Sequence, residues 1–472
     1  MTGVSTFQQF FEDLSDVMLR VNTKLQRDVT LRSRVSKRFT RKEVCEFLAI
    51  DQASLWRAAE QEPLFPEGER SGRERTFSPH EVMLIRALMA SRPSSKKQFM
   101  WWREPGDPLK VIAVGSQKGG TSKSLTAAHL AQYLCLEYGL RVGVIDSDPQ
   151  ATISLYFADD QLNLMDPDIL GMADFMGAAD PKAQEPTDLT PEEMDAIWQD
   201  TPWPGTRLIP GGPAIQNADM ALFFMSQARQ NEGQSFPAYR VLYDAIQKWD
   251  HGMGPRTRPM DLRDTDGNFD MEAYQNALTE TVDVIIIDQQ PSLTFTQMNG
   301  LIAADCVIVA QTMKGFDLST LTGYVTNIRD YTSVVTQHDP SFPLGNADHC
   351  VLATIVQESN EQDIQHLIDL KVQAPEWVAP VYYMRSDAIP NMAEQYKSAY
   401  EYQPPKSRKK SAQSFIENAN AVNDYLVSRA LPELPSRGYA QQFLDTMRER
   451  QIERQQKKEA AQQAKEMEQE NG

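Results

Sequence analysis

Apolar residues repeat at two different spacings along this chain, and the spacing changes near residue 105. Before that point they recur at three- and four-residue steps, as they do on one face of a helix. The first such stretch, residues 5–27, carries Phe7, Phe10, Phe11, Leu14, Val17, Met18, Val21 and Leu25. It predicts an amphipathic helix, which either packs on its own chain or serves as a dimerisation helix.

Residues 40–90 predict three further short helices. Thr40 and Glu43 form a capping box at the start of the first helix, and residues 49–51 form a tight turn before a second helix over 52–60. A loop rich in glycine, proline and arginine follows, and Ser78 caps the third helix. This order predicts a winged or MerR-like helix-turn-helix, with a plain three-helix packing module as the alternative.

Beyond residue 105 the apolar residues form short continuous runs, as in strands that are buried on both faces. The sequence predicts strands at 109–114, 141–146, 282–288, 305–311, 351–357 and 378–384, and a helix over 124–138 that ends at Gly139. Two runs end in aspartate, which places acidic side chains at the carboxyl edge of a parallel sheet. The expected fold class is α/β: a P-loop parallel sheet flanked by helices, with an N-terminal α-helical, winged helix-turn-helix domain.

The pattern divides the chain into four segments. We expect an N-terminal helix in 1–37, a DNA-binding domain in 38–104, a nucleotide-binding domain in 105–435 and a charged helical or disordered tail in 436–472. Residues 159–200 hold twelve acids and one lysine, which predicts an exposed, mostly helical insertion, and residues 264–270 predict a polar turn.

Composition excludes several classes of protein. The hydrophobic content of 41% supports a real core, yet no run of 18 apolar residues is present to span a membrane. The four cysteines are scattered without metal-ligand spacing, and the N-terminus does not resemble a signal peptide. We therefore expect a cytoplasmic protein without a membrane partner.

The net charge of −18 is unevenly distributed. Residues 1–110 hold 19 basic and 15 acidic residues, whereas the rest of the chain holds 28 and 50. A basic first quarter on an acidic body indicates that the N-terminal part meets a polyanion.

The stretch GSQKGGTSKS, residues 115–124, follows the first predicted strand and opens a helix, as a phosphate-binding loop does. Lys123 is placed to reach the β- and γ-phosphates of ATP, and Ser124 to hold Mg²⁺. Ser122 stands where the last glycine of the common motif is expected, and Lys118 is an additional lysine. The predicted nucleotide-binding residues are Gly119, Gly120, Thr121, Ser122, Lys123, Ser124 and Leu125.

Four segments together resemble the ParA/MinD family of ATPases with a deviant Walker A loop. They are KGGTSKS (118–124), VIDSDPQATISLYF (144–157), DVIIIDQQPSLTFTQMNGLIAAD (283–305) and MRSDAIPNMAEQYKSAYEY (384–402). The resemblance covers about residues 108–430. Together with the preceding helix-turn-helix, these segments resemble the large plasmid-partition subclass of the family, which includes the RepA proteins of RepABC replicons.

The resemblance implies catalytic roles for Lys118, Lys123 and Asp148. Lys118 would cross a dimer interface to the partner's nucleotide, so that two ATP molecules are sandwiched between subunits. Asp148 would orient the attacking water. Ser124, Asp146 and Asp288 would form the Mg²⁺ environment. Gln289–Gln290 departs from the usual Cys-Pro, and weak basal hydrolysis is expected.

Two groups of residues are predicted to bind DNA. In the N-terminal domain we expect Ser54 and Arg57 to face the major groove, with Arg70, Arg73 and Arg75 on phosphates. A second group suits nonspecific phosphate contacts with nucleoid DNA and comprises Lys397, Lys406, Arg408, Lys409 and Lys410.

The resemblance thus implies a homodimeric DNA-segregation ATPase. A ParB-like centromere-binding protein would stimulate it, and it would repress its own promoter through an operator. The alternative is a nucleotide-controlled transcriptional regulator without a segregation role. A division-site relative would need a membrane-binding amphipathic helix, and an iron–sulfur relative would need cluster cysteines, and the sequence shows neither.

Overall fold

The computed structural model describes residues 37–450, apart from 73, 94–96, 160–163, 165–168, 341–347, 388 and 391–394. Outside this range it describes only single positions, which are 9, 10, 13, 14, 17, 20, 452, 453 and 456. Most of the predicted helix over 5–27 and about half of the tail therefore lie outside the described residues. The described positions between 9 and 20 are helical, and the dimerisation role stays a prediction. Among the residues described, no helix is both long and apolar enough to cross a membrane.

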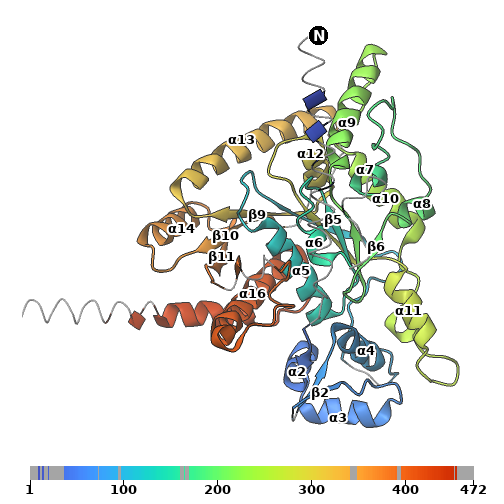
Figure 1. The fold of residues 1–472 in the computed structure, drawn as a ribbon, viewed down its shortest axis with the longest axis vertical. Coiled ribbons are helices and arrows are strands. Elements are labelled where there is room, and N and C mark those ends of the chain that lie inside the picture. The colour runs from blue at the N-terminus through green and yellow to red at the C-terminus, as the bar shows by residue number, and fades with distance from the viewer. Residues whose placement is uncertain are drawn as a thin grey trace, which may run out of the picture.

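An eight-stranded sheet forms the centre of the molecule (Figure 1). Its strands lie in the order β11-β10-β9-β4-β8-β5-β7-β6, and all neighbours are parallel except β6 and β7. All six strands predicted from apolar runs are confirmed. The bounds are β4 Lys110–Gly115, β5 Val142–Asp146, β6 Gln199–Asp200, β7 Thr206–Ile209, β8 Val284–Asp288, β9 Cys306–Thr312, β10 Cys350–Val356 and β11 Val378–Met384.

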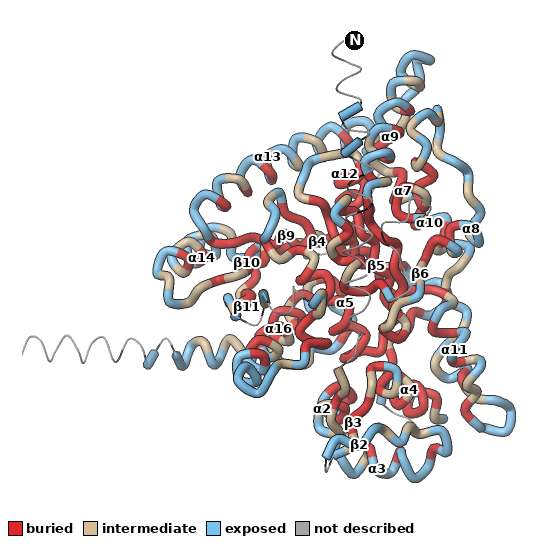
Figure 2. Tube along the Cα trace, viewed as in Figure 1, coloured by how far each residue is buried: buried red, intermediate tan, exposed pale blue. Residues whose placement is uncertain are grey.

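Helices cover both faces of this sheet, so its strands are buried on both sides (Figure 2). On one face α5 (Lys123–Tyr138) and α16 (Lys409–Ala430) pack against alternate strand residues. On the other face lie α9 (Ala214–Asn231), α10 (Val241–Met253) and α12 (Phe295–Ala303). The remaining helices are α6 Ser154–Phe157, α7 Met172–Phe175, α8 Pro191–Asp195, α11 Met271–Thr279, α13 Gly315–His338 and α14 Glu361–Gln373, with 3-10 turns η1 Pro259–Asp261 and η2 Lys406–Arg408.

The N-terminal lobe has the element order expected of a winged helix-turn-helix. It comprises β1 Phe39–Thr40, α2 Arg41–Leu48, α3 Gln52–Gln61, β2 Glu69–Ser71, β3 Glu74–Phe77 and α4 Pro79–Ala90. The capping boxes at Thr40 and Ser78 are confirmed. The predicted basic loop forms an antiparallel β-hairpin, whose strand β3 pairs with both β1 and β2.

This lobe packs against the C-terminal end of α5, the helix that follows the glycine-rich loop (Figure 1). Arg86 of α4 is fully buried at the junction. Its guanidinium donates to the carbonyl oxygens of Phe99 at 2.7 Å and Phe47 at 2.6 Å, and to that of Leu136 in α5. The lobe and the sheet domain thus share one continuous apolar core across the predicted boundary at 104.

The acidic insertion differs from its prediction. Residues 159–200 form only the short helices α7 and α8 and the strand β6 among the residues described, not a mostly helical segment. Phe175 and Trp198 are buried, and the ring centroids of Trp198 and Trp249 lie 5.2 Å apart. A few apolar side chains therefore anchor this segment despite its many acids. The polar turn at 264–270 is confirmed, with Asp264 accepting from the backbone of Asn268 at 2.8 Å.

Candidate active site

The loop between β4 and α5 presents an open backbone surface. Apart from the adjacent residues of the chain, no atom of the described residues lies within 4 Å of the position that a Cβ would occupy on Gly119 or Gly120, and Gly120 has a left-handed φ of 78°. Ser122, at the N-cap of α5, also adopts a left-handed conformation with φ 64° and makes no side-chain cap hydrogen bond. The serine thus keeps the backbone shape that a glycine would adopt there, at a steric cost of about 1–2 kcal/mol. The fold supplies an anion cradle at a helix N-terminus.

Lys123 lies buried at the start of α5, beneath this loop. Its Nζ donates to the carbonyl oxygen of Lys118 at 3.4 Å. Burial lowers the pKa of Lys123, while the nearby carboxylates of Asp288 and Asp148 act in the opposite direction. A buried lysine among carboxylates is placed to bind an anion at the open loop.

The two strand-ending aspartates lie side by side, because Asp146 of β5 and Asp288 of β8 are register partners in adjacent parallel strands. Asp146 accepts from the backbone of Asp148 at 3.0 Å, the backbone of Ser154 at 3.0 Å and the Ser154 hydroxyl at 2.6 Å. Burial raises the pKa of Asp146 to about 7 despite these donors. Asp146 therefore fixes the loop that carries Asp148. The structure brings Asp146, Asp148 and Lys123 together around Asp288.

Asp288 differs from Asp146 because neither of its carboxylate oxygens has a hydrogen-bond partner among the described residues, although both are buried. Burial and the neighbouring Asp146 raise the pKa of Asp288 well above its usual value, whereas the nearby Ser124 hydroxyl and the positive charge of Lys123 act to lower it. Buried carboxylates normally pair or bind a metal ion. Oxygen ligands from a carboxylate and a hydroxyl suit Mg²⁺, so Asp288 and Ser124 fit that ion.

Lys118 contacts the start of α13 in this structure. It forms an ion pair with Asp317 in the first turn of α13, and its Nζ lies 5.7 Å from the ring centroid of Phe316. Asp317 is almost completely buried and also accepts from the Thr312 hydroxyl. Burial alone would raise the pKa of Asp317, but the hydrogen bonds from Lys118 and Thr312 lower it overall. Sequence reasoning missed Asp317, because no local motif marks it.

The segment after Asp288 is tied to two neighbouring helices. Gln290 donates to the hydroxyls of Thr294 and Thr296, and the backbone of Thr296 donates to Asp219 of α9 at 2.8 Å. Gln289 is fully buried, and its side-chain amide has no hydrogen-bond partner among the described residues. The departure from Cys-Pro thus gives a hydrogen-bonded segment that contains one unsatisfied amide.

The residues predicted to bind DNA in the N-terminal lobe are distributed over α3 and the hairpin. Ser54 is half-buried and accepts from the Arg57 guanidinium at 3.1 Å. Arg70 is exposed on β2, whereas Arg75 is held by the backbone and carboxylate of Glu67. Position 73 lies outside the described residues.

The second basic group lies at the start of α16. Lys406, Arg408, Lys409 and Lys410 are exposed, while Lys397 is half-buried and separate in sequence. Tyr400 and Tyr402, which interleave with these lysines in the sequence, are buried in the core. The surface is therefore cationic without aromatic side chains from these two positions.

Comparison with known proteins decides the family. The model of the CobQ/CobB/MinD/ParA nucleotide binding domain matches residues 112–425, about two thirds of the chain. The chain belongs to this family. Its match begins in β4, ends in α16 and contains the glycine-rich loop, Asp146, Asp288 and Lys118, so the site described above lies within the matched nucleotide binding domain.

Individual relatives agree with this assignment. A Sinorhizobium fredii protein, named provisionally as replication protein A, is 24% identical over 325 residues, which are 65% of this chain and 69% of the relative. Protein SopA of Escherichia coli K12 is 27% identical over 222 residues, which are 47% of this chain and 45% of SopA. A solved structure entitled "Partition Protein" matches the ParA-like fold with a TM-score of 0.51 at 15% identity, over 87% of this chain and 98% of that chain.

Proposed function

We propose that this chain is a Mg²⁺-dependent ATPase that segregates DNA, in the manner of the plasmid-partition members of its family. One observation carries the nucleotide part of the proposal. The buried carboxylate of Asp288 has no hydrogen-bond partner among the described residues and lies near Lys123 and Ser124, below a loop whose backbone is open to a ligand. An unpaired buried carboxylate beside an anion cradle fits a metal–phosphate ligand.

Each residue has a defined task in this proposal. Lys123 and the backbone N–H groups of the loop bind the phosphates of ATP, and Ser124 and Asp288 hold Mg²⁺. The ion neutralises charge on the phosphate oxygens when it is bound. Asp148 orients the attacking water, and Asp146 keeps Asp148 in place through the hydrogen bonds described above. Weak basal hydrolysis follows if the site is completed only in a dimer.

Lys118 supplies that dependence on a second subunit. In the dimer it contacts the partner's nucleotide, so it must first leave Asp317. The proposal has three further parts. The cations at the start of α16 bind nucleoid DNA nonspecifically, and a ParB-like centromere-binding protein stimulates hydrolysis. The N-terminal lobe represses the protein's own promoter. All of these events take place in the cytoplasm.

A second function, nucleotide-controlled transcriptional regulation, is favoured by one structural feature. Helix α5 begins at the glycine-rich loop and ends against the N-terminal lobe, where Leu136 contacts Arg86. The nucleotide site and the predicted DNA-binding lobe are therefore joined by one continuous element. Both functions can reside in one protein.

Calorimetry with Mg-ATP tests the nucleotide site. Lys123→Ala should abolish detectable binding, because the phosphates lose their buried counter-ion. Lys248→Ala, which removes a surface lysine paired with Asp188, is the matched control and should bind like the parent. Unchanged affinity in Lys123→Ala would refute the site.

A plasmid-loss assay then separates the two functions. If Lys123→Ala loses the plasmid while the parent retains it, segregation is supported. If the parent has no effect on plasmid inheritance but represses its promoter in a nucleotide-dependent way, the regulator is the correct function.

A further inference from the structure

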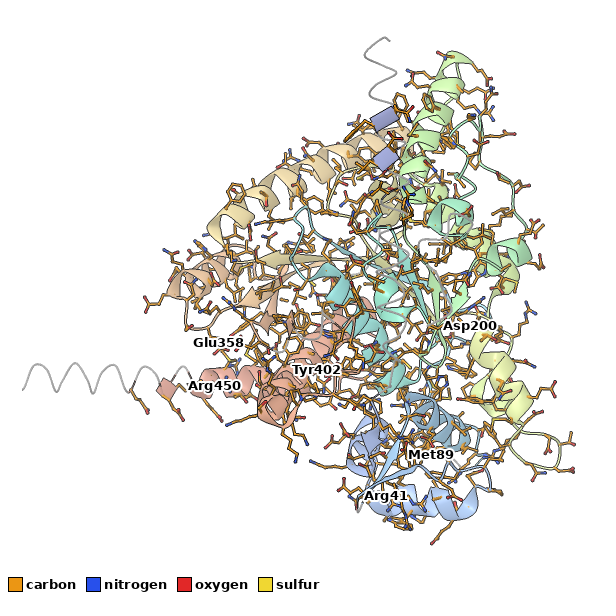
Figure 3. All side chains as sticks on the ribbon, viewed as in Figure 1. Arg41, Met89, Asp200, Glu358, Tyr402 and Arg450 are labelled. Carbon is orange, nitrogen blue, oxygen red and sulfur yellow. The ribbon has the colours of Figure 1, made fainter. Side chains whose placement is uncertain are left out.

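Helix α3, whose Ser54 and Arg57 are predicted to face the major groove, exposes a large aromatic side chain that the sequence patterns did not single out. Trp56 is 53% exposed. The guanidinium of Arg41 lies 4.7 Å from the centroid of its ring, which is a cation–π contact. Arg41 belongs to the preceding helix α2, and Figure 3 labels it in the N-terminal lobe, away from the central sheet. The stacking restricts the indole ring without burying it.

Trp56 faces a groove between α3 and the β2–β3 hairpin. The groove has a volume of about 290 Å³. Its walls come from α3 and the hairpin, through Gln52, Trp56, Ala59, Arg75 and Phe77. Glu67 also lines it, but that carboxylate is paired with Arg75. The Arg41 side chain makes no ion pair or hydrogen bond with any residue that the structure describes, so its charge is available to a ligand in the groove.

Helix α3 therefore has two exposed rows, and only one of them faces the hairpin. Gln52, Trp56 and Ala59 form the row along the groove, at helical spacing. Arg57 lies on the other row, where its guanidinium is engaged by Ser54 Oγ at 3.1 Å and the Ala53 carbonyl at 3.4 Å. A DNA duplex that contacts both α3 and the hairpin must pass over the groove row.

We propose that Trp56 and Arg41 together form a DNA-backbone contact of the N-terminal lobe. The indole ring packs against deoxyribose and its N–H binds a phosphate oxygen, while the Arg41 guanidinium binds an adjacent phosphate. This pair sets the position of α3 in the groove of the duplex and does not read bases. The inference rests on the proposed DNA-binding function of the lobe.

Binding and fluorescence measured together test the pair. The probes are end-labelled duplexes from the region upstream of the protein's own reading frame and a mixed-sequence duplex. Trp56→Ala and Arg41→Ala should each weaken binding to all duplexes by about tenfold, and Arg41→Ala should lower the slope of log affinity against log salt by about 1. Trp56→Phe should retain most of the affinity, because a phenyl ring still packs on the sugar.

The chain has seven tryptophans, so the emission of Trp56 is obtained as the difference between the parent and Trp56→Phe. This difference signal should change on DNA addition and become protected from acrylamide. Trp377→Ala is the matched control, since Trp377 is 51% exposed in a different part of the fold. Mg-ATP affinity and circular dichroism verify that each variant is folded.

The outcomes separate this inference from the function on which it rests. If the parent binds DNA while Trp56→Ala and Arg41→Ala bind equally well and the Trp56 signal is unchanged, the contact is refuted and DNA binding stands. If either variant loses affinity for one sequence only, the pair reads bases and the backbone assignment is wrong. If the parent binds Mg-ATP but none of the duplexes, DNA binding by the lobe fails and this inference fails with it.

Discussion

Lys118 of the glycine-rich loop is ion-paired with Asp317 in the first turn of α13, although 199 residues separate them in sequence. The same carboxylate accepts from Thr312 at the end of β9, so both of its oxygens are engaged. A lysine held in this way is not available to a second subunit. The pair therefore opposes the dimer contact that the proposed mechanism requires.

Asp317→Asn should weaken this hold on Lys118, because the ion pair becomes a neutral hydrogen bond. We expect a larger ATP-dependent dimer fraction by sedimentation and a severalfold rise in basal phosphate release. Lys118→Ala should retain ATP binding and lose hydrolysis. Asp330→Asn, which removes an exposed acid of the same helix, is the control. Hydrolysis at the parent rate in Lys118→Ala would disprove the cross-dimer role.

Ser122→Gly should leave the loop shape unchanged and stabilise it slightly. The left-handed φ of 64° at Ser122 carries a steric cost of about 1–2 kcal/mol, which glycine removes, while the larger unfolded-state entropy of glycine returns about 0.5–1 kcal/mol. The expected net gain lies between zero and about 1.5 kcal/mol, measured by chemical denaturation. Ser122→Ala keeps the Cβ and should show no gain. A clear loss of stability in Ser122→Gly would show that the serine hydroxyl stabilises the loop.

Glu137 makes stability depend on pH near neutrality. Burial raises the pKa of Glu137 to about 7, although Arg437 and Arg86 oppose this shift. The folded state then binds more protons than the unfolded state between about pH 4.5 and 7, so this residue's contribution to stability falls as the pH rises through that window. The total change is at most about 3 kcal/mol. As the pH rises from 5 to 8, Glu137→Gln should become more stable relative to the parent, as measured by thermal denaturation. A stability difference that does not vary with pH would show that Glu137 is not a buried carboxyl with a raised pKa.

Removing residues 1–104 should not yield an intact ATPase domain. The truncation would expose the C-terminal end of α5, where Tyr138 packs against Trp101, and leave the Leu136 carbonyl without Arg86. We expect aggregation or a much lower melting temperature. Arg86→Met tests the same junction with one substitution and should cost about 3 kcal/mol, because three buried carbonyls lose their donor. Arg57→Met, on the exposed face of α3, is the control. A truncated protein with parental stability and ATP affinity would establish an independent domain.

Much of the fold could be predicted from local sequence because its signals are local. The apolar runs gave six strands, and the capping boxes at Thr40 and Ser78 gave two helix starts. The short strands β6 and β7 carry too few residues for a periodic signal. The acidic insertion was mispredicted because charge composition does not reveal which few apolar side chains, such as Trp198, become anchors.

The candidate site divides in the same way. Lys123, Ser124 and the strand-ending Asp146 and Asp288 follow from a motif and from strand order. Asp317 could not be found, because its contact with Lys118 exists only after β9 and α13 have packed beside the loop. The exposed row of α3 that faces the hairpin could not be predicted from the sequence either. A helical pattern predicts which residues are buried, but not which exposed residues lie beside another element.

Helix α5 connects the nucleotide-binding loop to the N-terminal lobe without a break. Its 16 residues span about 24 Å. The glycine-rich loop holds one end, and the packed junction at Arg86 holds the other. Every residue of α5 except Ser124 is buried, so the helix is packed along its whole length. By geometry alone, a tilt of about 5° at its first turn would displace the last turn by about 2 Å over that length. A displacement at the glycine-rich loop would therefore reach the N-terminal lobe through a single helix, because Arg86 of α4 is hydrogen-bonded to the last turn of α5.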